Sequence, residues 1–198
     1  MAKAKKKSNV YSVIYMIVIT AICALLLGLL SEFTKETIAD NREFEVQSAI
    51  LNSAGIEYTE DNIGEVFDAH VTEIDADRKI YEIHDGNTML GYSFYYVGGA
   101  LWGDIEGYLG ITEDYSELLG VSITDNNETP GLGGRVTESW FLEQFRGIEV
   151  TDGDFITYAP NPGSNMDAIS GATQTSTSFR AMVMNSTHDF IDYMKGAQ

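Results

Sequence analysis

Small and hydroxyl-bearing residues cluster near the C-terminal end, in the stretch Asp-Ala-Ile-Ser-Gly-Ala-Thr-Gln-Thr at residues 167–175. Gly171 and Ala172 have almost no side chain, so a bulky anion can approach the backbone there. Hydroxyl groups that can donate hydrogen bonds to phosphate oxygens, or be esterified, belong to Ser170, Thr173 and Thr175. A helical pattern over residues 176–194 follows, and the free N–H groups at a helix start favour an anion. The stretch suits a phosphate site, or equally an ordinary Ser/Thr-rich capping loop.

Two further segments could line a ligand site. Glu-Thr-Pro-Gly-Leu-Gly at residues 128–133 is a turn, because Pro130 fixes one backbone dihedral and Gly131 tolerates a positive one. Gly-Ala-Leu-Trp-Gly at residues 99–103 places Trp102 beside small residues. A tryptophan there either contacts a ligand or packs in the core or a turn, which is its commoner fate.

The stretch at 167–175 resembles the flavinylation motif of the FMN-binding subunits of the Nqr and Rnf redox complexes. In that family the last Thr or Ser of an Asp-x-x-Ser/Thr-Gly-Ala-x-x-Thr/Ser pattern carries FMN through a phosphoester bond, which would be Thr175 here. Residues 128–133 resemble a second signature of the family, and residues 99–103 are similar to the Leu-Trp pattern of the C-type subunit of Nqr. The resemblance implies covalent FMN on Thr175 and these further cofactor-binding residues: Ser170, Gly171, Ala172, Thr173, Trp102, Glu128, Thr129, Leu132 and Gly133.

Within that set, the resemblance gives Glu128 and Thr129 polar contacts to the flavin, Leu132 an apolar wall, and Trp102 a contact with the isoalloxazine ring. Flavins need both hydrogen bonds and a dry face that tunes the potential. No residue of the chain is assigned a catalytic role. The 3 histidines and 1 cysteine lack metal-ligand spacing, so no metal is expected.

The implied function is that of an electron-transfer subunit in a membrane-bound, ion-translocating NADH:quinone oxidoreductase of the Nqr type. A flavin transferase would attach the FMN, and other membrane subunits would exchange electrons with it. The G-type subunit of an Rnf-type ferredoxin:NAD oxidoreductase is the alternative, because the chain is short for the C-type subunit of Nqr. A stand-alone extracytoplasmic covalent-FMN reductase and a non-redox anchor protein are further hypotheses.

Residues 10–30 contain no charged side chain and are long enough to cross a hydrocarbon layer of ~30 Å as a helix. Four lysines precede them, which by the positive-inside rule predicts an N-terminus in the cytoplasm and an FMN domain outside the cytoplasmic membrane. A cleaved signal peptide is the competing interpretation, but no Ala-x-Ala site follows the run. The predicted organisation is a basic N-terminus at 1–9, a transmembrane helix at 10–30, a helical stalk at 31–55 and the FMN-binding domain at 56–198.

Charge is unevenly distributed along the chain. After residue 30 there are 8 basic and 30 acidic residues, so the net charge of that part is −22. This excludes nucleic-acid binding, which needs basic partners for phosphates. Either a solvated acidic surface or an attraction for cations is compatible with it.

The fold class expected is α+β, one domain with an antiparallel sheet backed by helices. A helix over 36–52 should stop near Gly55, because glycine is common just after a helix end. Alternation and turn residues predict strands, and apolar periodicity predicts helices. The expected strands are 78–84, 89–97, 103–111, 117–124 and a weak 153–158, and the expected further helices are 65–74, 138–146 and 176–194.

Overall fold

The computed structural model describes residues 9–196. Helix α1 (Asn9–Ala54) contains the apolar run, and the side chains of residues 10–30 are exposed along it. It is long and apolar enough to cross a membrane. Contacts divide the chain into two units, with the boundary after Glu43. The second unit, which begins at Phe44, contains every other helix and strand.

The second unit is built on one sheet of five strands that pair in sequence order, all antiparallel. The strands are β1 (Val71–Asp75), β2 (Ile80–Asp85), β3 (Thr88–Gly99), β4 (Asp104–Thr112) and β5 (Leu118–Asn126). Successive hairpins connect them, and β3 with β4 forms the longest pair, from Gly91 opposite Thr112 to Gly99 opposite Asp104. The antiparallel sheet expected from alternation and turn residues is confirmed.

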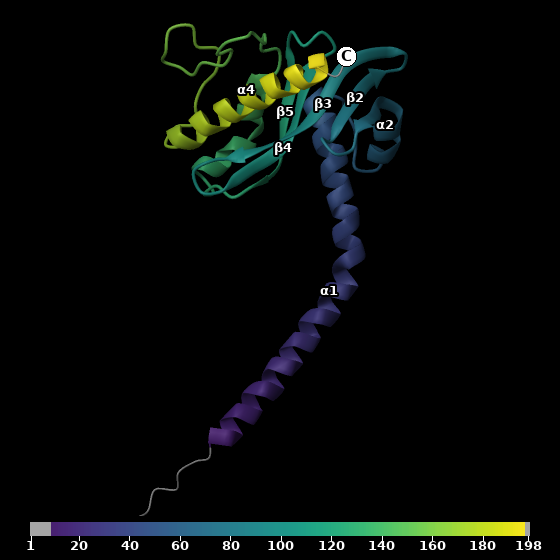
Figure 1. Cartoon of the computed structure of the whole chain (residues 1–198), viewed down its shortest axis with the longest axis vertical. Coiled ribbons are helices and arrows are strands. Elements are labelled where there is room, and N and C mark those ends of the chain that lie inside the picture. The colour runs from purple at the N-terminus through teal and green to yellow at the C-terminus, as the bar shows by residue number, and fades with distance from the viewer. Residues whose placement is uncertain (1–8, 197–198) are drawn as a thin grey trace, which may run out of the picture. The chain divides into compact units, whose positions relative to one another are not determined.

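One face of the sheet packs against helix α4 (Thr173–Gly196), which lies across the strands in Figure 1. Phe94 and Phe190 stack with ring centroids 4.1 Å apart. Phe179 on the same helix is fully buried and contacts Tyr96 edge-on. A segment after β5 closes this core with the 3-10 helix η1 (Gly133–Thr137), helix α3 (Ser139–Leu142) and the 3-10 helix η2 (Glu143–Phe145).

The opposite face packs against the last turns of α1 and against α2 (Ile63–His70). Ser53 lies so close to the sheet that its hydroxyl is 2.7 Å from that of Ser93, and a Cβ added to Gly110 would lie 2.2 Å from its carbonyl oxygen. Gly110 pairs with Gly120 across β4 and β5. The helix end therefore sits where two strands lack side chains.

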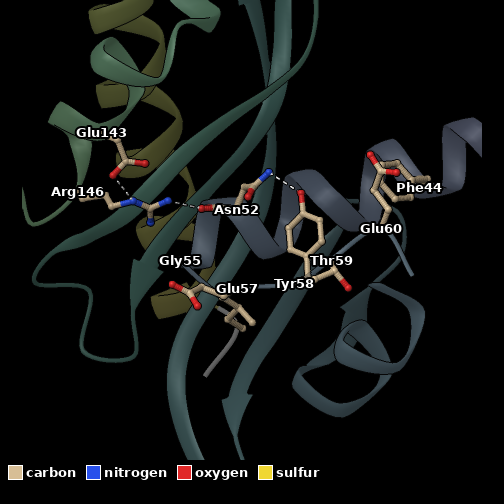
Figure 2. A pocket seen from close by; sticks show the side chains of 10 residues that line it. Phe44, Asn52, Gly55, Glu57, Tyr58, Thr59, Glu60, Glu143 and Arg146 are labelled. Carbon is tan, nitrogen blue, oxygen red and sulfur yellow. Dashed lines mark hydrogen bonds and ion pairs between the residues drawn. The ribbon is translucent and has the colours of Figure 1, made fainter. Parts of the chain in front are cut away.

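Arg146 ties the end of α1 to the sheet. Its guanidinium donates to the carbonyl oxygens of Asn52 and Leu119, both at 2.7 Å, and to the carboxylate of Glu143 at 2.9 Å. Figure 2 shows Arg146 between Glu143 and Asn52 at the edge of a cavity of about 860 Å³. α1 stops at Ala54, and Gly55 follows with φ of +74°, as predicted.

Four expected elements differ from the structure. Residues 71–74 form β1 instead of continuing a helix, because Val71, Thr72 and Glu73 pair with β2. Residues 153–158 form no strand, because the Asn165 side chain bonds to the backbone of Phe155 and Thr157. The expected helix at 138–146 is split into α3 and η2. The C-terminal helix starts at Thr173, three residues before the predicted position.

Candidate functional site

The first turn of α4 is held by a tight turn before it. The Ile169 carbonyl accepts from the Ala172 N–H, and the Ser176 hydroxyl accepts from the Ile169 N–H while it donates to the Ala172 carbonyl. Gly171 has φ of +80°, a conformation that favours glycine. Thr173 and Thr175 therefore belong to the first turn, where backbone N–H groups and the helix dipole favour a phosphate.

Thr175 lies at a junction of three segments. Its side chain is 1% exposed, and its hydroxyl donates to Oε2 of Glu128 at 2.6 Å. The other oxygen of Glu128, Oε1, accepts from the backbone N–H of Trp102 at 2.8 Å. Glu128 is itself 6% exposed. The buried carboxyl thus joins the C-terminal helix, the loop after β5 and the turn between β3 and β4.

The loop at 128–134 covers this junction. Gly133 lies over the pair, because a Cβ there would lie 2.2 Å from Oε2 of Glu128 and 2.6 Å from Oγ1 of Thr175. The loop's tip is closed by its own bonds, since the N–H groups of Leu132 and Gly134 both donate to the Thr129 carbonyl. Only glycine fits at position 133 without displacing the carboxyl or the hydroxyl.

Apolar side chains surround the junction at the surface. Trp102 is 71% exposed and Leu132 is 49% exposed. Leu132 contacts the turn before α4, where its Cδ2 would be 3.7 Å from a Cβ on Gly171. A cavity of about 370 Å³ opens beside Thr173, lined by Ala100, Leu101, Thr173, Gln174, Thr177 and Ser178. Exposed rings and aliphatic groups next to helix N–H groups and hydroxyls form a surface that suits a flat, phosphorylated ligand.

Two groups outside the predicted set support the site. The Tyr158 hydroxyl donates to the Ser176 carbonyl at 3.0 Å, and burial raises the pKa of Tyr158 well above its usual value, so this donor stays protonated. Gln144 donates to and accepts from the backbone of Asp167. Neither contact has a signal in the sequence, because each joins distant segments.

The predicted site residues thus fall into two groups. In the first group, buried hydrogen bonds join Glu128 to Thr175 and to the backbone of Trp102. Gly133 lies over these groups, and Ala172 is buried in the turn before α4. The side chains at the surface are those of Ser170, Thr173, Thr129, Leu132 and Trp102, and Gly171 is exposed among them. Trp102 is largely open to solvent, so its contribution to the buried contact is its backbone N–H.

The described residues offer little for a metal. Across residues 9–196, no group of three or more His, Cys, Asp or Glu side chains lies close enough to hold an ion. Near the loop, the Arg135 guanidinium bonds to Glu138 and lowers the pKa of that carboxyl, as does the indole N–H of Trp140. These charges are paired with each other rather than pointed at Thr175.

Known proteins resemble this chain in sequence and in structure. Residues 100–188 match the FMN-binding domain family. The G-type subunit of an ion-translocating oxidoreductase complex from Methanosarcina acetivorans is 31% identical over 58% of this chain and 63% of its own length. The C-type subunit of a Na⁺-translocating NADH-quinone reductase from Chlamydia pneumoniae is 34% identical over 46% of this chain and 36% of its own length.

The chain therefore spans less than two thirds of either relative. The crystal structure of the C-type subunit of a Na⁺-translocating NADH-quinone reductase from Parabacteroides distasonis superposes with a TM-score of 0.67 and 20% identity, over 79% of this chain and 94% of the other. That likeness shows the fold. Together these matches show that residues 100–188 are similar to the FMN-binding domain family, and that the chain resembles the C-type and G-type subunits of ion-translocating oxidoreductases.

Proposed function

We propose that this chain is an electron-carrying subunit of a membrane-bound, ion-translocating oxidoreductase, with FMN attached to Thr175 by a phosphoester. The observation that carries the proposal is the position of Thr175: the hydroxyl at the end of the flavinylation motif lies in a helix's first turn, at the junction of three segments inside the FMN-binding match. The anion preference of a helix start supports a phosphate there.

The residues at the junction have separate roles in this proposal. Thr175 bears the phosphoryl group, and Ser170, Thr173 and the backbone around Gly171 and Ala172 hold its oxygens. Thr129 and Glu128 offer polar groups, and Leu132 and Trp102 offer apolar surface to the ring. Bound FMN would supply the electron transfer, while the chain binds, orients and partly shields it.

A covalent tether is physically reasonable for a flavin on the outer side of a membrane. A cofactor that dissociates there is lost, whereas a tether keeps its local concentration high. In this proposal, residues 10–30 span the cytoplasmic membrane with the N-terminus inside. A separate flavin transferase loads the domain, and neighbouring membrane subunits exchange electrons with it.

The test is the mass of the protein. Chain co-expressed with a flavin transferase should gain the mass of FMN minus water and should fluoresce on a denaturing gel under ultraviolet light. Thr175→Ala should abolish both signals, and Thr175→Ser should retain them because the hydroxyl remains. A dark band from the unmutated chain would refute the proposal. An adduct that survives in Thr175→Ala would move the site to Thr173 or Ser176.

The Rnf-type assignment is the second candidate, and the share of each relative that this chain matches favours it. The G-type relative is matched over 63% of its length, but the C-type relative over only 36%. The Nqr type, favoured by the Leu-Trp segment, stays a prediction. Identifying the proteins that co-purify with the chain from its native membrane would decide between the two, and a chain that purifies alone with its flavin would favour the stand-alone reductase.

A further inference from the structure

Glu128 accepts a hydrogen bond from the Thr175 hydroxyl, a contact that a residue binding only the flavin ring would not require. Both of its carboxyl oxygens are engaged below the surface, one with the Thr175 hydroxyl at 2.6 Å and one with the Trp102 N–H at 2.8 Å. A buried carboxyl that accepts a hydrogen bond from a hydroxyl at this distance is placed to receive its proton.

We propose that Glu128 is the proton acceptor that activates Thr175 for flavin attachment, and that it thereby selects Thr175 among the neighbouring hydroxyls. This inference rests on the proposed covalent FMN. It assigns Glu128 to the attachment reaction, in addition to any contact with the finished cofactor.

The neighbouring hydroxyls differ from Thr175 in this respect. Ser176 is fully buried, but its hydroxyl is committed to the backbone of Ala172 and Ile169. Thr173 and Thr177 are exposed, and within residues 9–196 neither hydroxyl is hydrogen-bonded to a carboxylate. Of the hydroxyls in the first turn, Thr175 alone among the described residues has an acceptor that can take a proton.

The attachment step balances with a flavin dinucleotide as donor, because its pyrophosphate provides a leaving group. The Thr175 oxygen bonds to the phosphorus next to the flavin, the bond from that phosphorus to the bridging oxygen breaks, and a nucleoside monophosphate leaves. The hydroxyl proton passes to Oε2 of Glu128. The resulting neutral carboxylic acid no longer repels the phosphodiester and can donate a hydrogen bond to it.

Access to Thr175 requires the loop's tip to lift, since the hydroxyl is covered by Gly133. The bonds of Leu132 and Gly134 go to Thr129, inside the same loop. Glu128 is held separately, by the Trp102 N–H on its side chain and by Asn126 on its backbone N–H. Lifting residues 131–134 breaks the bonds that the Leu132 carbonyl accepts from the Arg135 N–H and the Gly134 carbonyl from the Thr137 hydroxyl, whereas the bonds that hold Glu128 beside Thr175 are separate from these.

The experiment measures the rate of flavin attachment to the full-length chain in detergent, using purified flavin transferase, flavin adenine dinucleotide and intact-mass spectrometry. Glu128→Gln keeps the size and an acceptor oxygen but loses the basicity. It should slow attachment by about 100-fold, the lower end for general-base catalysis. A rate equal to that of the unmutated chain would overturn the inference.

Asp114→Asn is the matched control. Asp114 accepts the hydroxyls of Thr112 and Ser116, both at 2.7 Å, at the opposite end of the β4–β5 hairpin. Its replacement should leave the attachment rate unchanged. If Glu128→Gln does not fold, the pair Glu128→Asp and Glu128→Asn makes the same comparison with a shorter side chain, and equal rates for the two would overturn the inference. No adduct on the unmutated chain would instead refute the proposed function itself.

Discussion

The junction at Thr175 depends on residue 133 being a glycine, which has no side chain. Gly133 allows the loop to lie directly over Glu128 and Thr175, where any Cβ would lie within 2.6 Å of both. The closed loop covers a carboxyl and a hydroxyl whose hydrogen-bond partners, among residues 9–196, are each other and the Trp102 backbone. Burial of such a pair is favourable only when it is fully hydrogen-bonded, so the three segments depend on one another for their positions.

Leu132 is the residue whose replacement should change the flavin without removing it. Leu132→Asp places a negative charge on the apolar surface beside the site, and adding an electron to a flavin near an anion becomes less favourable. The midpoint potential should fall by the equivalent of about 1 kcal/mol, the interaction of two charges ~4 Å apart in water. Redox titration of the attached flavin measures this shift.

Ile74→Asp adds the same charge to an exposed position on β1, the strand at the opposite edge of the sheet from β5. It should leave the potential unchanged. Equal potentials for Leu132→Asp and the unmutated chain would argue against a ring contact at Leu132. In both variants the mass of the adduct should persist, because neither residue touches the Thr175 hydroxyl.

Sequence reasoning identified the segments of this site but not their contacts. The motif ending at Thr175 and the loop at 128–133 stand out because glycine and proline have local conformational requirements. The bond between Glu128 and Thr175 joins residues 47 positions apart, so no spacing rule predicts it. The resemblance gave Trp102 a role for its ring, whereas the structure shows that its backbone N–H makes the buried contact.

Among the secondary elements, the end of α1 depends most on close approach to the sheet. Gly110→Ala would place a Cβ 2.2 Å from the Ser53 carbonyl oxygen, which is backbone and cannot rotate away. The helix end or strand β4 must then shift. Overpacking of this kind typically costs about 1–3 kcal/mol in the free energy of unfolding. Thermal unfolding followed by circular dichroism in detergent should show a lower midpoint.

Gly64→Ala in α2 is the control for that substitution, because a Cβ there meets no atom within 4 Å. Alanine favours a helix over glycine by about 1 kcal/mol, so this variant should be no less stable than the unmutated chain. If Gly110→Ala unfolded at the same temperature as the unmutated chain, the close contact between the Ser53 backbone and strand β4 would be wrong.

Strands and helices differed in how well their limits could be predicted. The hairpins of β2 to β5 follow from alternating residues and turns, which are local signals. The pattern over residues 65–74 predicts a helix, whereas Val71, Thr72 and Glu73 belong to β1 because they pair with β2. Helix α4 starts three residues before the apolar periodicity predicts, because the Ser176 hydroxyl donates to the Ala172 carbonyl. Hydrogen bonds of this kind leave no trace in the pattern of apolar residues.

For the whole molecule, the proposed function requires the acidic second unit to lie on the far side of the membrane from the lysine-rich N-terminus. The apolar segment at 10–30 and the lysines before it are the basis for that orientation. A net charge of −22 after residue 30 is compatible with a solvated domain. The orientation can be tested because the chain has one cysteine, Cys23, which lies within the apolar segment.

Ser164→Cys, made together with Cys23→Ser, introduces a single thiol at an exposed position in the turn before residues 167–175. A membrane-impermeant maleimide reaches only the outer side of the membrane of intact spheroplasts. It should label the introduced thiol there to at least the same extent as after lysis. The unmutated chain should stay unlabelled in spheroplasts, since a membrane-impermeant reagent does not reach a thiol inside the bilayer. Labelling of the introduced thiol only after lysis would place the FMN domain in the cytoplasm. The rationale for a permanent tether would then fail, because a flavin lost inside the cell can be replaced from the soluble pool.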